Sequence, residues 1–351
     1  MAYIVAGIQQ LGIGVSNLKE ARDWYQKILG YDVIIFDEAA EANLMSRYTD
    51  NQIQTRHAVL TYNMKGGGGF EVWQNTSRTP EAPSFEIQLG DLGIFIGKIK
   101  APDIHRAFKQ FQKSKVNIIS EINNSPEGKP HFFIKDPYNN IFEIEQGTDW
   151  LLKQPKVTGG NSGVIIGVSD MDRSIKLYSQ ILGYETVVYD QEKIFNDLTS
   201  LPGGNEKYRR VLLKHENKRI GPFSPMLGDS TIELIQAVDH KVRKIYEDRL
   251  WGDLGYIHLC FDIIGMHDLK TECEAAGYNF TVDSAVGFDM GEAAGHFSYI
   301  EDPDGTLIEF VETHKIPIIK KIGWYLNITK RKQKKPLPMW FFKILGASRK
   351  I

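Results

Sequence analysis

The chain has 351 residues, and with 42% hydrophobic and 25% charged residues its composition is typical of a soluble globular protein of one large or two ordinary domains. We expect no membrane-spanning helix, because no apolar run approaches roughly 18 residues, and no secretory signal, because the first residues lack a basic region followed by an apolar one. Two cysteines, Cys260 and Cys273, are too few for a disulfide framework and favour a cytoplasmic location.

The net charge of −2 hides an uneven distribution. Residues 315–351, here called the basic segment, hold 11 Lys or Arg and no Asp or Glu, while residues 1–314 hold 31 basic and 44 acidic residues. The segment either lies on the acidic body or contacts an anionic ligand or membrane surface. In the second case its aromatic residues would assist, namely Trp324, Trp340, Phe341 and Phe342. We expect no nucleic acid partner.

The chain contains duplicated stretches. Residues 11–31 match residues 164–184, and both predict a short apolar strand, a Ser-Asn or Ser-Asp helix cap, and a helix that ends at Leu-Gly. Near the end of each half, Asp136-Pro-Tyr-Asn and Asp302-Pro-Asp-Gly both predict a turn that leads into an apolar strand containing a glutamate. The sequence therefore consists of two duplicate halves, which we place at 1–150 and 158–314.

Each half divides again into two similar units. Residues 1–75 predict a strand, a helix and three more strands, and residues 90–147 repeat that order, with a helix at 102–114 and a closing strand at 141–146. Residues 160–238 and 252–313 give the third and fourth units. We therefore expect an α+β protein in which four βαβββ units form two cupped mixed sheets, followed by a basic C-terminal extension at 315–351.

These openings and Asp-Pro closing turns resemble the vicinal oxygen chelate superfamily, which includes glyoxalase I, bleomycin-resistance proteins and extradiol ring-cleaving dioxygenases. The resemblance covers residues 1–314 and is more specific for the fold than for a reaction. It implies two glyoxalase-like domains, at 1–150 and 158–314. It also implies that the first and last strands of each unit present one metal ligand apiece to the cup.

The ligand positions can be located by counting back from the glycine that ends each opening helix. In chain order these positions and the closing-strand carboxylates hold Gln10 and Glu71, Ile96 and Glu143, Gly163 and Glu233, and His258 and Glu309. When the two copies of Gly-Asp-Leu-Gly, at 90–93 and 252–255, are aligned, Ile96 occupies the position equivalent to that of His258.

The pairing of units decides which ligand sets exist. If neighbouring units pair, both sites lack a ligand. If the first unit pairs with the fourth, Gln10, Glu71, His258 and Glu309 form one set, which resembles that of eukaryotic-type glyoxalase I, and the second and third units form a set without an imidazole or an amide. One complete and one degenerate site is the more economical interpretation.

The resemblance implies a divalent metal ion (Zn, Ni, Mn or Co) that polarises a carbonyl group of a small-molecule substrate with vicinal oxygens. It assigns the proton transfer to Glu309, with Glu71 as a second proton carrier, which predicts a lyase, isomerase or epimerase. Two arginines that hold glutathione in glyoxalase I are replaced by Gly14 and Leu254, whereas a substrate-binding asparagine has a match in Asn75. We therefore expect a substrate other than the glutathione hemithioacetal.

Two other functions remain open. A metal-free small-molecule binding protein of the bleomycin-resistance kind would use a cup with Trp73, Tyr256 and Phe310 near it. An extradiol dioxygenase would need iron and a second imidazole, for which His296 is a candidate. Structural roles are expected for His131 and for Cys260 in the core.

Overall fold

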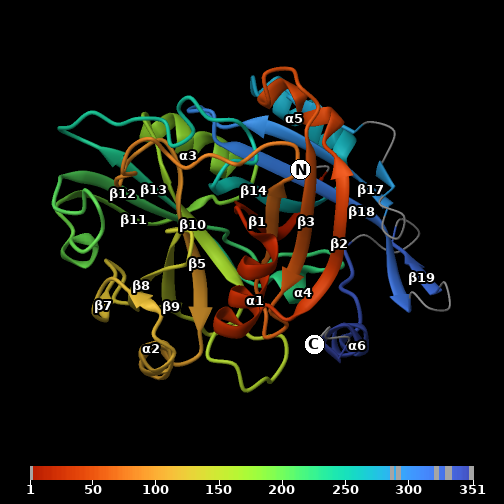
Figure 1. The fold of residues 1–351 in the computed structure, drawn as a ribbon, viewed down its shortest axis with the longest axis horizontal. Coiled ribbons are helices and arrows are strands. Elements are labelled where there is room, and N and C mark those ends of the chain that lie inside the picture. Colours follow the sequence, from red (N-terminus) through yellow and green to blue (C-terminus); the bar gives the residue numbers. More distant parts are fainter. Residues whose placement is uncertain (1–2, 285–287, 290–293, 320–323, 329–333, 348–351) are drawn as a thin grey trace.

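The computed structural model describes residues 3–284, 288–289, 294–319, 324–328 and 334–347. Within these residues the strands form one ten-stranded and one nine-stranded mixed sheet, each curled into a cup (Figure 1). The expected α+β architecture is confirmed.

The first sheet combines the first and fourth units. Its main path runs β15-β17-β18-β14-β1-β4-β3-β2, with β16 on β17 and β19 on β18. The strands are β1 (Ile4–Gly14), β2 (Val33–Glu41), β3 (Thr55–Tyr62), β4 (Gly69–Asn75), β14 (Gly255–Ile264), β15 (Val282–Asp283), β16 (Phe288–Asp289), β17 (Ala294–Glu301), β18 (Leu307–Ile319) and β19 (Trp324–Asn327).

The second sheet combines the second and third units. Its path runs β11-β12-β13-β10-β5-β9-β8-β6, with β7 on β8. The strands are β5 (Gly93–Ala101), β6 (Asn117–Ile118), β7 (Asn123–Asn124), β8 (Pro130–Lys135), β9 (Ile141–Gln146), β10 (Asn161–Gly167), β11 (Thr186–Lys193), β12 (Tyr208–Lys214) and β13 (Thr231–Ala237). Both cups are thus made across the two halves of the chain, so the pairing that gives one complete ligand set is the one observed.

The two duplicated helices begin at their predicted caps and the first ends at its predicted glycine, whereas the helix after Asp170 ends at Gln180, before the expected Leu182-Gly183. The side chains of Asn17 and Asp170 accept hydrogen bonds from the first turns of their helices, and Gly30 ends the first helix in the left-handed conformation that favours glycine. The helices are α1 (Leu18–Leu29), α2 (Ile104–Lys113), α3 (Met171–Gln180), α4 (Ser224–Leu227), α5 (Met266–Ala275) and α6 (Met339–Ala347), with 3-10 turns at η1 (Asn43–Tyr48) and η2 (Asn196–Leu198). In the described part of the chain, no helix is both long and apolar enough to cross a membrane.

The duplicated motifs make the same contact twice. Tyr25 on α1 donates a hydrogen bond of 2.6 Å to Asp136 in the turn of the second unit. Tyr178 on α3 donates one of 3.1 Å to Asp302 in the turn of the fourth unit. Each opening helix is therefore tied to the closing turn of the unit that follows it, and these contacts join the two sheets through a shared apolar core.

The basic segment is partly built into the body. The strand β18 continues to Ile319, and β19 pairs with it. The sequence indicated that Phe341 and Phe342 could assist contact with an outside surface, but both are buried on α6. Trp340 is exposed. Much of the remaining basic sequence lies outside the described residues.

Candidate metal centre

The four expected ligands meet at the middle of the first cup. Gln10 lies on β1, Glu71 on β4, His258 on β14 and Glu309 on β18, four strands that are neighbours in the sheet. The His258 Nε2 atom lies 3.3 Å from Glu71 Oε2 and 3.1 Å from Glu309 Oε2. Gln10 Nε2 donates hydrogen bonds of 3.0 and 3.3 Å to the same two carboxylate oxygens. Residues separated by up to 299 positions therefore converge on one point.

A glycine makes room for the imidazole. Gly12 lies opposite His258 in the β1–β14 pair, and a Cβ atom on Gly12 would come 2.5 Å from His258 Cε1 and 2.6 Å from Nε2. In the second cup the residue equivalent to Gly12 is Ile165, and the residue equivalent to His258 is Ile96. No imidazole has to be accommodated at that position, so an isoleucine can replace the glycine. The small residue and the imidazole thus occur together in one cup only.

Burial and mutual charge set the protonation of the cluster. Burial disfavours ionisation, but the hydrogen bond and charge of His258 hold the pKa of Glu71 below its ordinary value. Burial, reinforced by the charge of Glu71, raises the pKa of Glu309 even though His258 opposes it. Burial lowers the pKa of His258, but the charges of Glu309 and Glu71 outweigh that and raise it. Of the two carboxylates, Glu309 is the one more able to carry a proton.

The donor set fits a divalent cation. One ligand atom each from Glu71, His258 and Glu309 lies within 4.8 Å of the others, and all three residues are buried. The buried Gln10 Oε1 has no hydrogen-bond partner, and an amide can exchange its oxygen and nitrogen by a half-turn. Three oxygen donors and one imidazole suit Zn, Ni, Mn or Co, and two carboxylates balance the charge of such an ion.

One wall of this cup is aromatic. Trp73 and Trp251 meet edge to face with their rings 4.2 Å apart, and Met45 and Tyr299 belong to the same apolar cluster. The Tyr299 hydroxyl lies 3.4 Å from His258 Nδ1. Tyr256 and Phe310, which were expected near the cavity, pack instead in the core between the sheets.

Three other residues considered from the sequence lie outside the four-residue cluster. The side chain of Asn75 bonds to Gln54 and accepts hydrogen bonds from the backbone of the following turn. His296 Nε2 lies 2.6 Å from Asp283 Oδ1. Cys260 is fully buried, and burial raises the pKa of its thiol, as expected for a core residue.

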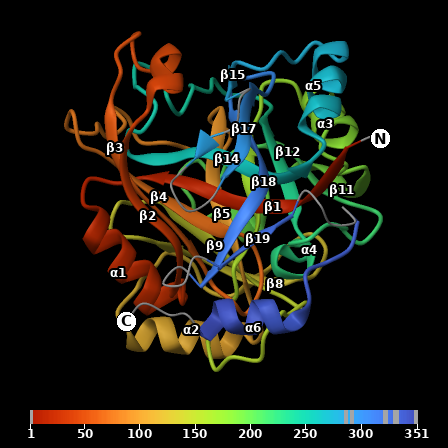
Figure 2. The same ribbon diagram turned by 90° about the vertical axis from the view of Figure 1, so that its right-hand side faces the viewer.

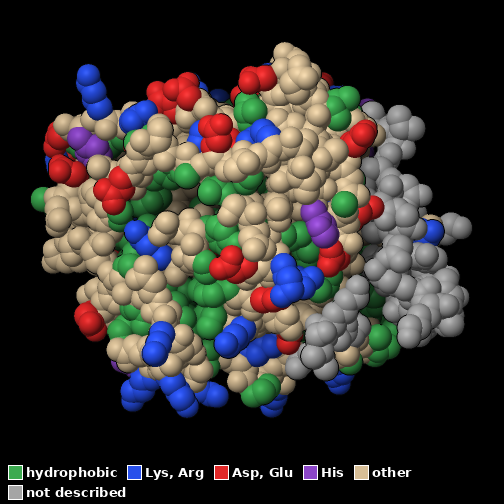
Figure 3. Space-filling model, in the orientation of Figure 1, with side chains coloured by type: hydrophobic (Ala, Val, Ile, Leu, Met, Phe, Trp, Pro, Cys, Tyr) green, Lys and Arg blue, Asp and Glu red, His purple; other side chains and the backbone are tan. Residues whose placement is uncertain are grey.

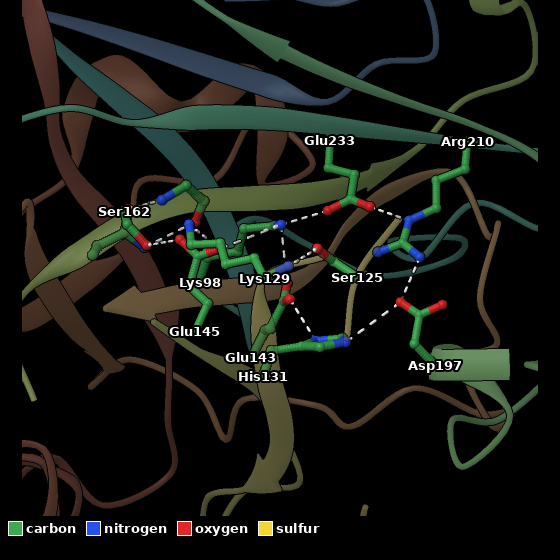
Figure 4. Close-up of polar contacts among 12 residues, drawn as sticks. Lys98, Ser125, Lys129, His131, Glu143, Glu145, Ser162, Asp197, Arg210 and Glu233 are labelled. Atoms are coloured by element: carbon green, nitrogen blue, oxygen red, sulfur yellow. Dashed lines mark hydrogen bonds and ion pairs between the residues drawn. The ribbon is translucent and has the colours of Figure 1, made fainter. Parts of the chain in front are cut away.

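The second cup holds a lysine between the corresponding carboxylates. Lys98 Nζ lies 3.0 Å from Glu143 Oε2 and also pairs with Glu233 (Figure 4). The duplicated Gly-Asp-Leu-Gly places Lys98 where the first cup has Cys260, and each of these residues is paired in register with its glutamate on the next strand. The ammonium group therefore reduces the repulsion between the two carboxylates that would otherwise face each other.

The rest of the second cup is also an ion-pair network. His131 Nδ1 lies 2.6 Å from Glu143, His131 Nε2 lies 3.4 Å from Asp197, and Arg210 joins Asp197 to Glu233 (Figure 4). The set of Ile96, Glu143, Gly163 and Glu233 contains no imidazole, but His131 reaches Glu143 from the neighbouring strand β8. The charge of Lys98 on the cup face of β5 was the sequence signal that could have indicated this network.

A cavity of about 920 Å³ lies away from the first cup. Its lining includes Lys100, Lys129, Glu145, Ser162 and Met339, and none of the four clustered residues of the first cup. It therefore does not mark the candidate metal centre.

The chain is similar to several known proteins. A lactoylglutathione lyase of Haemophilus influenzae is 25% identical over 151 residues, which are 42% of this chain and 88% of that protein. Glyoxalase I from Zea mays superimposes with a TM-score of 0.53 at 15% identity, covering 87% of this chain and 92% of the other. A putative dioxygenase from Bacillus subtilis superimposes with a TM-score of 0.56 at 14% identity, covering 88% and 86%. These structural likenesses show the shared fold.

The family match spans most of the sequence. Residues 7–144 and 162–310 match the glyoxalase/bleomycin resistance protein/dioxygenase superfamily, one stretch in each half of the chain. The chain therefore belongs to that superfamily.

Proposed function

We propose that the protein is a divalent-metal-dependent lyase, isomerase or epimerase that moves a proton on the carbon next to a carbonyl group. The observation that carries this proposal is the convergence of Gln10, Glu71, His258 and Glu309 in the first cup. When bound there, the ion would polarise a substrate carbonyl oxygen.

The opposite pKa shifts of Glu71 and Glu309 suggest different roles for the two carboxylates. Glu71, whose pKa is held low, supplies a permanent negative charge, and we assign to it the secondary role in proton transfer. Glu309, whose pKa is raised by burial, suits the transfer itself, because a base works best when its pKa approaches the working pH. The imidazole of His258 and the amide of Gln10 would complete the metal ligands.

The surroundings support a substrate other than a glutathione adduct. The backbone carbonyl of Asp253 lies against Gly14 and would clash with any Cβ there, so β1 cannot carry an arginine at this position without moving. The aromatic wall formed by Trp73 and Trp251 favours a compact, partly apolar compound with vicinal oxygens.

One observation favours a second candidate, a metal-free small-molecule binding protein. Gln10 donates to both carboxylates, so the cluster is held together by its own hydrogen bonds. A ring-cleaving dioxygenase has less support, because among the described residues only His258 contributes an imidazole to the cluster and His296 is bound to Asp283. We also propose a reducing, cytoplasmic location, in keeping with the buried free thiols of Cys260 and Cys273.

The decisive experiment combines metal content with proton exchange. The purified protein, incubated with Mn²⁺, Zn²⁺, Ni²⁺ or Co²⁺ and desalted, should retain about one ion per chain, as a single complete ligand set requires. It should then exchange the α-proton of a small α-hydroxy ketone with deuterium, measured by NMR in D₂O. Bound metal without exchange on a panel of such ketones would refute the proton-transfer reaction, and failure to retain any of the four ions would favour the binding protein.

A further inference from the structure

The helix α6 is apolar on more than one side. Phe341 and Phe342 face inward and pack in a cluster with Met64, Leu227 and Leu337. Gly346 lies against Leu152, whose Cδ1 atom would be 3.0 Å from an added Cβ. This packing fixes the helix to the body of the protein.

The outer side of α6 is also apolar, although it is exposed. Met339, Trp340 and Ile344 are 43%, 49% and 42% exposed. These positions share one side of the helix with the exposed Lys343 and Ala347. Large apolar side chains gathered on one exposed element usually mark a contact surface.

The surroundings of this outer side are basic. Lys334 and Lys335 precede α6 and are exposed, and the basic segment as a whole has 11 basic and no acidic residues. The helix α2, which exposes Arg106, Lys109 and Lys113, lies at the lower edge of the molecule in both ribbon views, although Figure 1 shows it well apart from α6 along that edge (Figures 1 and 2). Lys and Arg side chains gather along this edge in the space-filling view (Figure 3).

We propose that the outer side of α6 docks on the surface of a bilayer that contains anionic lipids. Tryptophan and aliphatic side chains enter the boundary between headgroups and acyl chains, while lysines remain at the level of the phosphates. Because the inner side of α6 is held by the protein core, the helix lies on the bilayer rather than crossing it. A nucleic acid or an acidic protein would satisfy the lysines but leave Met339 and Ile344 in water, so the apolar residues favour lipid.

The test is co-sedimentation of the full chain with vesicles. Vesicles of phosphatidylcholine with about a third phosphatidylserine should bind the protein, and phosphatidylcholine alone should not, with binding weakened as NaCl rises from about 0.1 to 1 M. Trp340→Ser should weaken binding roughly ten-fold. Each of Lys334→Gln, Lys335→Gln and Lys343→Gln should weaken it about five-fold.

Ile194→Ser is the matched control, because Ile194 is 53% exposed but lies after β11, outside α6. It should leave vesicle binding unchanged, and all variants should keep the thermal midpoint and the metal content of the wild type. Equal binding to both kinds of vesicle, binding unaffected by Trp340→Ser, or retention on heparin without sedimentation on vesicles would overturn the proposal. None of these outcomes depends on the proposed proton-transfer reaction.

Discussion

Gly12 and His258 face each other across the β1–β14 pair so closely that one methyl group on Gly12 would occupy space held by the imidazole. The two residues come from the first and fourth units of the chain. The position of the imidazole, and with it the geometry of the candidate metal centre, therefore depends on the absence of a side chain on a different strand.

Replacing Gly12 with alanine should displace His258 and abolish metal retention. Overpacking of this kind costs about 1–3 kcal/mol of the free energy of unfolding. Elemental analysis after loading with Mn²⁺ and a urea denaturation curve measure the two effects.

Ile165→Val is the control for this variant, because Ile165 is the equivalent residue of the second cup. It should cost about 0.5–1.5 kcal/mol of stability and leave the metal content unchanged. Normal metal retention in Gly12→Ala would show that the imidazole is not a ligand.

The second prediction compares the same substitution, glutamate to glutamine, in the two cups. Glu309→Gln should weaken metal binding by more than the ~10–100-fold typical of changes outside the ligand shell, because it removes a carboxylate from the cluster. Glu143→Gln, the corresponding change in the second cup, should leave metal affinity as it is. Isothermal titration with Mn²⁺ compares the two, and equal losses would contradict the assignment of the metal to the first cup.

The third prediction concerns Lys98. Lys98→Met removes the ammonium between Glu143 and Glu233 and should cost about 3–5 kcal/mol of stability, as expected when one partner of a buried ion pair is lost. The Glu309→Gln substitution, which weakens metal binding in the first cup, allows binding in the second cup to be detected. In that background, Mn²⁺ should raise the thermal midpoint of the protein that also carries Lys98→Met, but not that of the protein that keeps Lys98.

Adding Glu143→Gln to Lys98→Met supplies the control for that experiment. The extra change should recover part of the stability, since it removes one uncompensated charge, and should also remove the response to Mn²⁺. A Lys98→Met protein as stable as its parent would mean that the ammonium does not reduce the repulsion in the second cup.

The fourth prediction is a loss of stability at alkaline pH. Burial works against the charged form of His131, but the charges of Glu143 and Asp197 prevail and raise its pKa to about 9, from an unfolded value of about 6.5. The stabilising charge is fully present below pH ~6.5 and is lost as the pH rises through 9, a change of up to about 3 kcal/mol. The difference in unfolding free energy between wild type and His131→Gln should become smaller as the pH rises from about 6.5 through 9. A difference that stays constant would contradict a stabilising charge on His131.

The sequence was sufficient for the fold and for the convergence of Gln10, Glu71, His258 and Glu309, for two reasons. The duplicated helix caps and Asp-Pro turns identify the four units, and the period of two along a strand identifies which residues face the cup. The choice between pairings followed from Ile96 and Gly163, which would have left each alternative site incomplete.

Only part of the ion-pair network of the second cup could be predicted in the same way. The register of Lys98 on β5 indicates a cation beside Glu143, but its long flexible side chain also reaches Glu233, a contact that the position on the strand does not determine. Arg210 and Asp197 come from a strand and a 3-10 turn that no repeat marks as part of the cup. Such contacts depend on tertiary packing rather than on local pattern.

The intertwining of the halves has a consequence for how the protein is made. Gln10 is synthesised near the start of the chain and Glu309 near the end of the second half, yet they share one cluster. A ribosome must therefore release nearly all of the chain before the cluster can close, and β1 waits without its neighbour β14 until then. Cutting the chain between residues 150 and 158 would give two fragments that each lack half of both cups and could regain the centre only by assembling with each other.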